Sequence, residues 1–150
     1  FLPDSQAAAK ADPSRPTKLG FSKLSFQWDR DGTVPEMFGS PSPDPLRPEV
    51  QNFMIGLLRE ILDRCGKRKN VVGAGFRVNG KFGLAYAGEA DKCGQDRGYS
   101  PWNIAEFQKD SGVKIPAGAN AGDWLQKNAW EKWTAWRCRK MRATIWMYTL

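Results

Sequence analysis

An apolar stripe over residues 48–65 constrains the fold of this chain more than any other feature of its sequence. Apolar side chains recur there at intervals of three and four residues: Val50, Phe53, Met54, Leu57, Leu58, Ile61, Leu62 and Cys65. This spacing places them on one side of an α-helix. Pro48 suits the first helical turn, and Gly66 suits the position just after the last one. Because such a helix is stabilised mainly by packing of its apolar face, we expect the stripe to lie in the core.

Two regions have the patterns of β-strands. Residues 24–28 alternate apolar and polar side chains and stop at the turn sequence Asp29–Gly32. Residues 71–78 form an apolar run of strand length, and Asn79-Gly80 joins it to the alternating residues Phe82, Leu84 and Tyr86. Asn-Gly between two such runs predicts a β-hairpin.

The C-terminal third predicts two further helices and one strand. Ser100 suits the cap of a helix that begins at Pro101 and ends at Gly112. A longer helix is expected over residues 123–142, and the apolar residues 145–150 suit a strand. Strands that alternate with helices predict an α/β fold, in which helices pack on a mixed sheet.

Length limits the size of this fold. A chain of 150 residues can form one domain with a sizeable core. A complete eight-fold (β/α) barrel needs roughly 200 residues or more. We expect a proline-rich arm or linker over residues 1–18 and a single α/β domain over 19–150. Because the chain begins with Phe1, a processed, secreted or periplasmic protein whose signal peptide has been removed is one expectation; the localisation stays open.

The chain contains no histidine, which narrows its chemistry. Ser-His-Asp and Cys-His nucleophiles and histidine-containing zinc sites are therefore excluded. The three cysteines, Cys65, Cys93 and Cys138, have no metal-binding spacing. We expect buried thiols, with one disulfide as the alternative, and no metal or cofactor.

Acidic residues gather just beyond the predicted strands. Asp29 and Asp31 follow the first strand, and Glu89 and Asp91 follow the second strand region. Ligand sites in parallel α/β sheets form on the loops beyond the carboxyl ends of the strands. Two carboxylates about 5 to 9 Å apart can hydrolyse a glycosidic bond without histidine, one as the acid and the other as nucleophile or base. We predict Asp29 and Glu89 as this catalytic pair.

The remaining candidates for substrate binding border the same loops. We expect Asp31 and Asp91 to contribute to substrate binding, and sugar rings to stack on four aromatic side chains: Trp28, Tyr86, Tyr99 and Trp102. Trp suits sugar faces, nucleobases and ordinary cores alike, so the aromatic content alone does not choose between these uses.

The run YSPWNIAEFQKDSG, followed by DWLQKNAWEKWTAWRCRKM, resembles part of the glycoside-hydrolase-like (β/α)-barrel proteins. In those proteins a Tyr-Ser-Pro loop after a central strand often leads into a long Trp-rich helix. The helix RPEVQNFMIGLLREILDRCG fits the same order of elements, so the resemblance covers about residues 21–150. It implies a half TIM-barrel-like fold, a plant or microbial polysaccharide or glycoside as partner, and, if the chain is an enzyme, glycoside hydrolysis with Glu89 as the acid. The chain departs from the family in lacking an Asn-Glu pair at a strand end, and Asn79-Gly80 interrupts the expected unit.

Two alternatives stay open. With a net charge of +7, the chain suits a non-enzymatic module that binds nucleic acid or another polyanion by backbone attraction and stacking. The residues for it lie on the last predicted helix: Lys127, Trp130, Lys132, Trp133, Trp136, Arg137, Arg139, Lys140 and Arg142. Alternatively, a barrel fragment would leave a strand edge and an apolar face open and would self-associate into a homo-oligomer.

Overall fold

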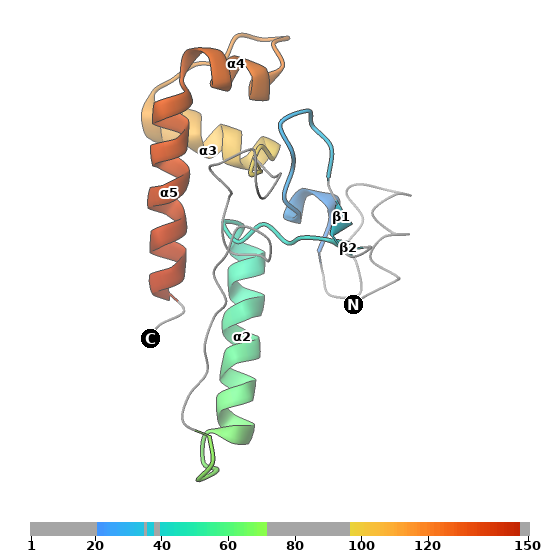
Figure 1. Cartoon of the computed structure of the whole chain (residues 1–150), viewed down its shortest axis with the longest axis vertical. Coiled ribbons are helices and arrows are strands. Elements are labelled where there is room, and N and C mark those ends of the chain that lie inside the picture. The colour runs from blue at the N-terminus through green and yellow to red at the C-terminus, as the bar shows by residue number, and fades with distance from the viewer. Residues whose placement is uncertain (1–20, 35, 38–39, 72–96, 148–150) are drawn as a thin grey trace.

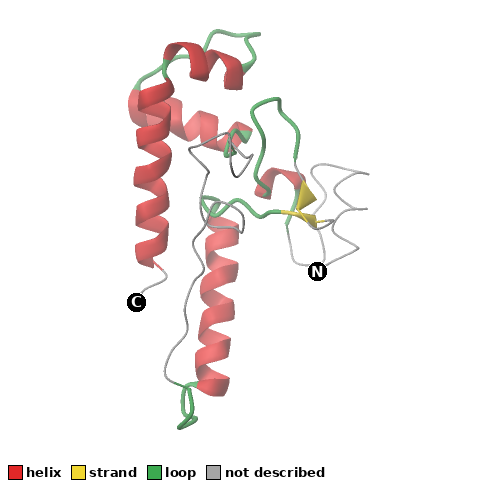
Figure 2. Ribbon diagram, in the orientation of Figure 1, coloured by secondary structure: helices red, strands yellow, loops and turns green. Residues whose placement is uncertain are grey.

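The computed structural model describes residues 21–34, 36–37, 40–71 and 97–147, and these are mostly helical (Figures 1 and 2). Four α-helices follow one another: α2 (Pro48–Cys65), α3 (Pro101–Ser111), α4 (Ala121–Asn128) and α5 (Trp130–Met147). The N-terminal part holds the 3₁₀ turn η1 (Lys23–Ser25) and two short strands, β1 (Glu36–Met37) and β2 (Ser40–Pro41). The strands pair antiparallel, with Glu36 opposite Pro41.

The predicted α/β fold with a half TIM-barrel-like sheet is therefore wrong for the described residues. In place of a strand at 24–28, the chain makes the turn η1 and a single antiparallel bridge between Phe26 and Pro43. Residues 145–147, expected in a strand, belong to α5. The Asn79-Gly80 hairpin and the arm over residues 1–18 lie outside the described residues.

Alternating prolines explain why no sheet grows at this bridge. The segment 42–44 bonds to residues 25–27 through Gln27 N–H to Ser42 O and Asp44 N–H to Ser25 O, both 2.8 Å. Prolines occupy the flanking and intervening positions, 41, 43 and 45. The nitrogens of these prolines point to the edge opposite residues 25–27, where a further strand would have to pair. They carry no hydrogen to donate to such a strand. The segment therefore ends the sheet rather than continuing it.

The helix α2 has the bounds that its sequence predicts, but its apolar stripe does not lie in the core. Val50 is its one buried residue; it packs with Phe21 and Phe26, and Phe53 meets Phe21 edge-on at 5.3 Å. Beyond this contact α2 extends away from the other helices (Figure 1), and four large apolar side chains are 37–50% exposed: Phe53, Leu57, Ile61 and Leu62. The described residues thus leave most of this face uncovered, and self-association through such a face stays a prediction.

The main core lies between α3, α4 and α5. The indoles of Trp133 and Trp136 stack at 5.4 Å, and Phe107 of α3 meets both edge-on at 5.1 and 5.9 Å. Leu125 of α4 joins them and, like Phe107 and Trp133, is fully buried. The Trp-rich helix is therefore the central element of the core.

Local capping explains where α3 begins and ends. The Ser100 hydroxyl accepts a hydrogen bond from Asn103 N–H at 3.2 Å, as an N-cap does, and Pro101 takes the first turn. Gly112 ends the helix in the left-handed region, with φ of 70°. These sequence predictions are confirmed. The single helix predicted over 123–142 is wrong, since the chain breaks at Ala129 into α4 and α5.

Candidate functional site

The first predicted carboxylates lie in a tight turn, as the sequence indicates. Asp29 N–H donates to Thr33 O at 2.8 Å and Gly32 N–H donates to Asp29 O at 3.1 Å, with Gly32 at φ of 84°. Asp31 is exposed, and its carboxylate accepts hydrogen bonds from the Thr33 N–H and hydroxyl at 2.9 and 2.8 Å. These two bonds lower the pKa of Asp31. Asp31 therefore has a structural use in the turn, besides its predicted substrate contact.

Asp29 faces a different neighbour, Arg97. The backbones of these two residues form an antiparallel bridge, and Arg97 Nε lies 3.5 Å from Asp29 Oδ1. The carbonyl of Trp28 accepts from both Gly98 N–H and Tyr99 N–H, at 2.9 and 3.0 Å. We call this contact between residues 28–29 and 97–99 the Asp29–Arg97 junction. Burial lowers the pKa of Arg97, and the adjacent Asp29 carboxylate opposes that effect.

The predicted sugar-stacking aromatics are only partly available. Tyr99 is 3% exposed and packs on Trp133 at 5.4 Å, so its ring cannot receive a sugar. Trp102 is half-buried, and the Arg47 guanidinium lies 5.1 Å from the centre of its ring. Trp28 is half-buried at the junction. The other predicted site residues, Tyr86, Glu89 and Asp91, lie outside the described residues.

The basic and aromatic residues of α5 do not form one exposed face. Trp133, Trp136 and Arg137 are at most 2% exposed. Arg137 lies 5.1–5.5 Å from the ring centres of Tyr99, Trp130 and Trp133, and its Nη1 donates to Arg97 O at 2.7 Å. Four other cations predicted for polyanion binding are exposed: Lys127, Lys132, Arg139 and Arg142. Stacking of nucleobases on Trp133 or Trp136 is therefore excluded in this fold.

A buried polar network, which the sequence did not predict, supports the junction. Asp44 is fully buried, and its carboxylate accepts from Leu46 N–H at 3.0 Å and from Asn103 Nδ2 at 2.6 Å. The Ser100 hydroxyl lies 3.4 Å from the same carboxylate, and Asn103 Nδ2 also donates to Gly98 O at 3.0 Å. Asp44 thus ties the loop before α2 to the segment that carries Gly98 and the start of α3.

A hollow at the junction of α4 and α5 is the second feature that the sequence did not reveal. Its volume is about 440 Å³, and it is lined by Val113, Trp124, Lys127, Asn128, Ala129, Trp130, Glu131 and Lys132. We call it the α4–α5 hollow. The helix break at Ala129 creates it, and no glycine or proline marks that break in the sequence. The i, i+3 and i+4 spacing of Trp124, Lys127 and Asn128 was its one available signal.

The described residues contain no cluster of three or more His, Cys, Asp or Glu side chains that could hold a metal ion. Cys65 and Cys138 are both free thiols; Cys138 is exposed, so the expectation of a buried thiol is wrong there. None of the helices in the described ranges is both long and apolar enough to cross a membrane. Comparison of the chain with family models, curated proteins and solved structures found no match.

Asp110 makes the contact between α3 and α5 sensitive to pH. Its Oδ2 accepts from Trp136 Nε1 at 2.8 Å and lies 2.8 Å from Lys140 Nζ. Hydrogen bonds from Lys140 and then Trp136 hold the pKa of Asp110 below its ordinary value of 3.8. A carboxylate whose pKa is depressed by folding stabilises the fold above its unfolded pKa, and this contribution disappears as pH falls through the folded pKa.

We therefore expect Asp110→Asn to be less stable than the natural chain at pH 7, with a difference that closes as pH falls below 3.8. Urea unfolding at pH 7, 5 and 3 measures it. Asp63→Asn, which changes an exposed carboxylate on α2, is the control and should show little difference at any of these pH values. A difference for Asp110→Asn that is as large at pH 3 as at pH 7 would contradict the assigned role of the carboxylate.

Proposed function

We propose that this chain is a carbohydrate-active protein, a glycoside hydrolase with paired carboxylates, whose site is centred on the Asp29–Arg97 junction. One observation supports the proposal: Trp28 and Asp29 are bonded to residues 97–99. In the sequence these residues come at the end of the predicted loop 87–98, which contains Glu89 and Asp91. Residues far apart in the sequence thus converge on one place, as a site requires. The absence of histidine fits a reaction that carboxylates alone can perform.

The two carboxylates have different tasks in this proposal. Asp29 is about one-third exposed and lies beside the buried Arg97 cation, which suits a carboxylate that acts in its charged form as nucleophile or base. Glu89 then protonates the leaving oxygen. Trp28 supplies the ring beside Asp29. Tyr99 is not part of the proposed site because it lies in the core.

The test is turnover by two variants, Asp29→Asn and Glu89→Gln. A screen of plant and microbial polysaccharides for released reducing ends first identifies a substrate. Each variant should then lose about 10²–10⁴-fold in rate, the range for removal of a general acid or base. Asp63→Asn, which changes an exposed carboxylate on α2 outside the proposed site, should retain most activity. Full activity in Glu89→Gln, with an unchanged melting curve, would refute the proposal.

The polyanion alternative is less well supported, because three of its residues, Trp133, Trp136 and Arg137, lie in the core. It predicts binding to single-stranded DNA that weakens steeply with salt, since bound phosphates release their counterions. Retention on an uncharged glycan should be insensitive to salt. Salt-sensitive DNA binding without glycan retention would favour this alternative.

A further inference from the structure

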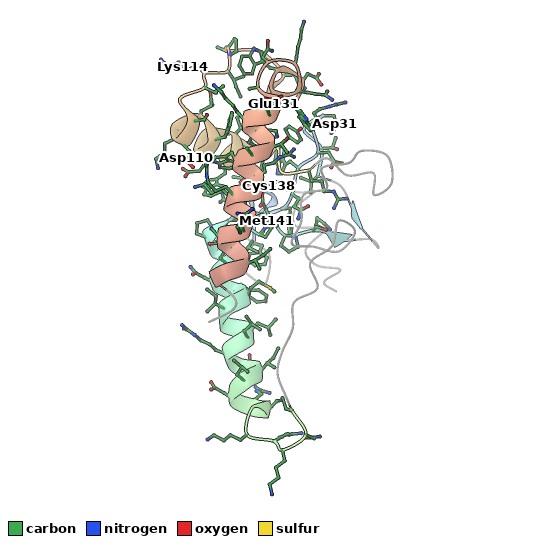
Figure 3. The ribbon with its side chains drawn as sticks, turned by 60° about the vertical axis from the view of Figure 1, so that its left-hand side comes forward. Asp31, Asp110, Lys114, Glu131, Cys138 and Met141 are labelled. Atoms are coloured by element: carbon green, nitrogen blue, oxygen red, sulfur yellow. The ribbon has the colours of Figure 1, made fainter. Side chains whose placement is uncertain are left out.

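We propose that the α4–α5 hollow binds an acidic sugar unit, a pyranose that carries a carboxylate as in a polyuronate. The inference deepens the proposed function and rests on it, because it names an acidic polysaccharide as the substrate class and gives the substrate a second contact. The hollow lies where the C-terminal half of α4 meets the first turn of α5, near Glu131 in Figure 3. Its volume of about 440 Å³ is that of a small-molecule site, which typically measures about 300–1,000 Å³.

Two indole rings give the hollow its apolar walls. Trp124 of α4 and Trp130 of α5 are half-buried; both pack against the main core while lining the hollow. Arg137 lies 5.5 Å from the centre of the Trp130 ring and helps to hold it. Side chains held in this way lose little conformational freedom when a ligand binds. Indole faces of this kind receive the C–H faces of pyranose rings.

The polar groups of the hollow favour a negatively charged sugar. Lys127 and Lys132 are exposed, and neither makes an ion pair within the described part of the chain. Asn128 donates through Nδ2 to Trp124 O at 2.9 Å, which leaves its amide oxygen for a hydroxyl group. Glu131 is the one carboxylate among the lining residues, so the lining has a net positive charge. Two ammonium groups suit a carboxylate, while Glu131 and Asn128 can accept from sugar hydroxyls.

The helix α4 connects the hollow with the Asp29–Arg97 junction. Arg30, in the turn after Asp29, donates to the Gln126 side chain and lies 3.5 Å from the Asp123 carboxylate. The eight residues of α4 are about 12 Å long in all, and this one short helix carries both the contact with Arg30 and the lining residues Trp124, Lys127 and Asn128. An extended polysaccharide held at Asp29 therefore has the hollow within reach along the same helix.

The test is calorimetric titration of the full chain with trigalacturonate at low salt. The double variant Lys127→Gln/Lys132→Gln and the single variant Trp124→Ala should each bind it at least about tenfold more weakly than the natural chain. Lys69→Gln, which removes an exposed cation outside the hollow, should bind normally. Lys67→Gln, a second exposed cation outside the hollow, should also bind normally.

Each outcome decides the inference separately from the proposed function. Weakened binding in the hollow variants, with normal binding in both controls, supports the inference even if no variant changes turnover. Equal affinity for maltotriose, a neutral trisaccharide, would overturn the acidic class. No binding of trigalacturonate, equal binding by the double variant, or binding of single-stranded DNA alone would overturn the inference as a whole.

Discussion

Replacing Trp133 with alanine should lower the free energy of unfolding by about 3–5 kcal/mol, the usual range for removal of a large buried aromatic side chain. Trp133 is fully buried and contacts the rings of Tyr99, Phe107 and Trp136 at 5.1–5.4 Å. Arg137 also lies 5.1 Å from the centre of its ring. Alanine would leave a cavity between α3 and α5. It would also remove one of the three aromatic rings that surround the Arg137 guanidinium.

Chemical unfolding followed by circular dichroism measures this loss of stability. Two further variants serve as comparisons. Trp133→Phe keeps a ring and removes an indole N–H that has no acceptor among the described residues, so it should lose much less stability. Trp102→Ala removes a half-buried indole and should also cost less. A loss below about 1 kcal/mol for Trp133→Ala would mean that α5 does not form the centre of the core.

Replacing Asp44 with alanine should lower the free energy of unfolding by about 3 kcal/mol. The carboxylate is fully buried and accepts from Leu46 N–H and Asn103 Nδ2, with the Ser100 hydroxyl nearby. Alanine removes the side-chain acceptor of Leu46 N–H and one of the two acceptors of Asn103 Nδ2, and the loss of an acceptor by a buried donor costs about 1–3 kcal/mol. Asp63→Ala, at an exposed position of α2, should stay within about 0.5 kcal/mol of the natural chain.

A double-mutant cycle tests whether the effect of Asp44 runs through Asn103. The Asp44 carboxylate and the Asn103 amide are 2.6 Å apart, so their replacements by alanine should destabilise the fold less together than the sum of the two separate losses. Unfolding free energies of the three variants measure this coupling. Strictly additive losses would show that Asp44 acts through other contacts.

Helix ends were predictable because their signals are local. The first turn at Pro48, the Ser100 cap and the left-handed Gly112 each depend on a few neighbouring residues. The break at Ala129 was not predictable, because alanine is the best helix former and the cause is tertiary. Ala129 ends α4 with φ of −147° and ψ of 24°, and the resulting change of direction lets Leu125 and Trp133 enter the same core.

The fold class was wrong because short alternating patterns do not distinguish a strand from an extended loop. Residues 24–28 alternate, yet Leu24 is exposed while Ser25, Phe26 and Gln27 are all buried, so burial does not follow the alternation. The stripe of α2 raises a related difficulty, since amphipathic spacing identifies an apolar face without identifying what covers it. Periodicity therefore gave the position of α2 but not its environment.

The candidate site was predictable only in part. The turn at Asp29 followed from its composition, but its contact with Arg97 joins residues 68 positions apart, and one sequence holds no signal for such a pairing. Composition also could not predict which of the Trp and Arg side chains on α5 are buried. Arg137 is buried because aromatic rings and the Arg97 carbonyl together replace its hydration.

Gly122 allows the Asp29–Gly32 turn to pack in direct contact with α4. A Cβ atom at this position would lie 2.3 Å from Arg30 O and 2.5 Å from Arg30 Cγ, so the backbone of α4 packs directly against both the backbone and the side chain of Arg30. A ligand that displaces the turn must therefore push on α4, which carries Trp124 two residues after Gly122. We expect the turn and the α4–α5 hollow to be thermodynamically linked, so that occupancy of either one alters affinity at the other by the same factor.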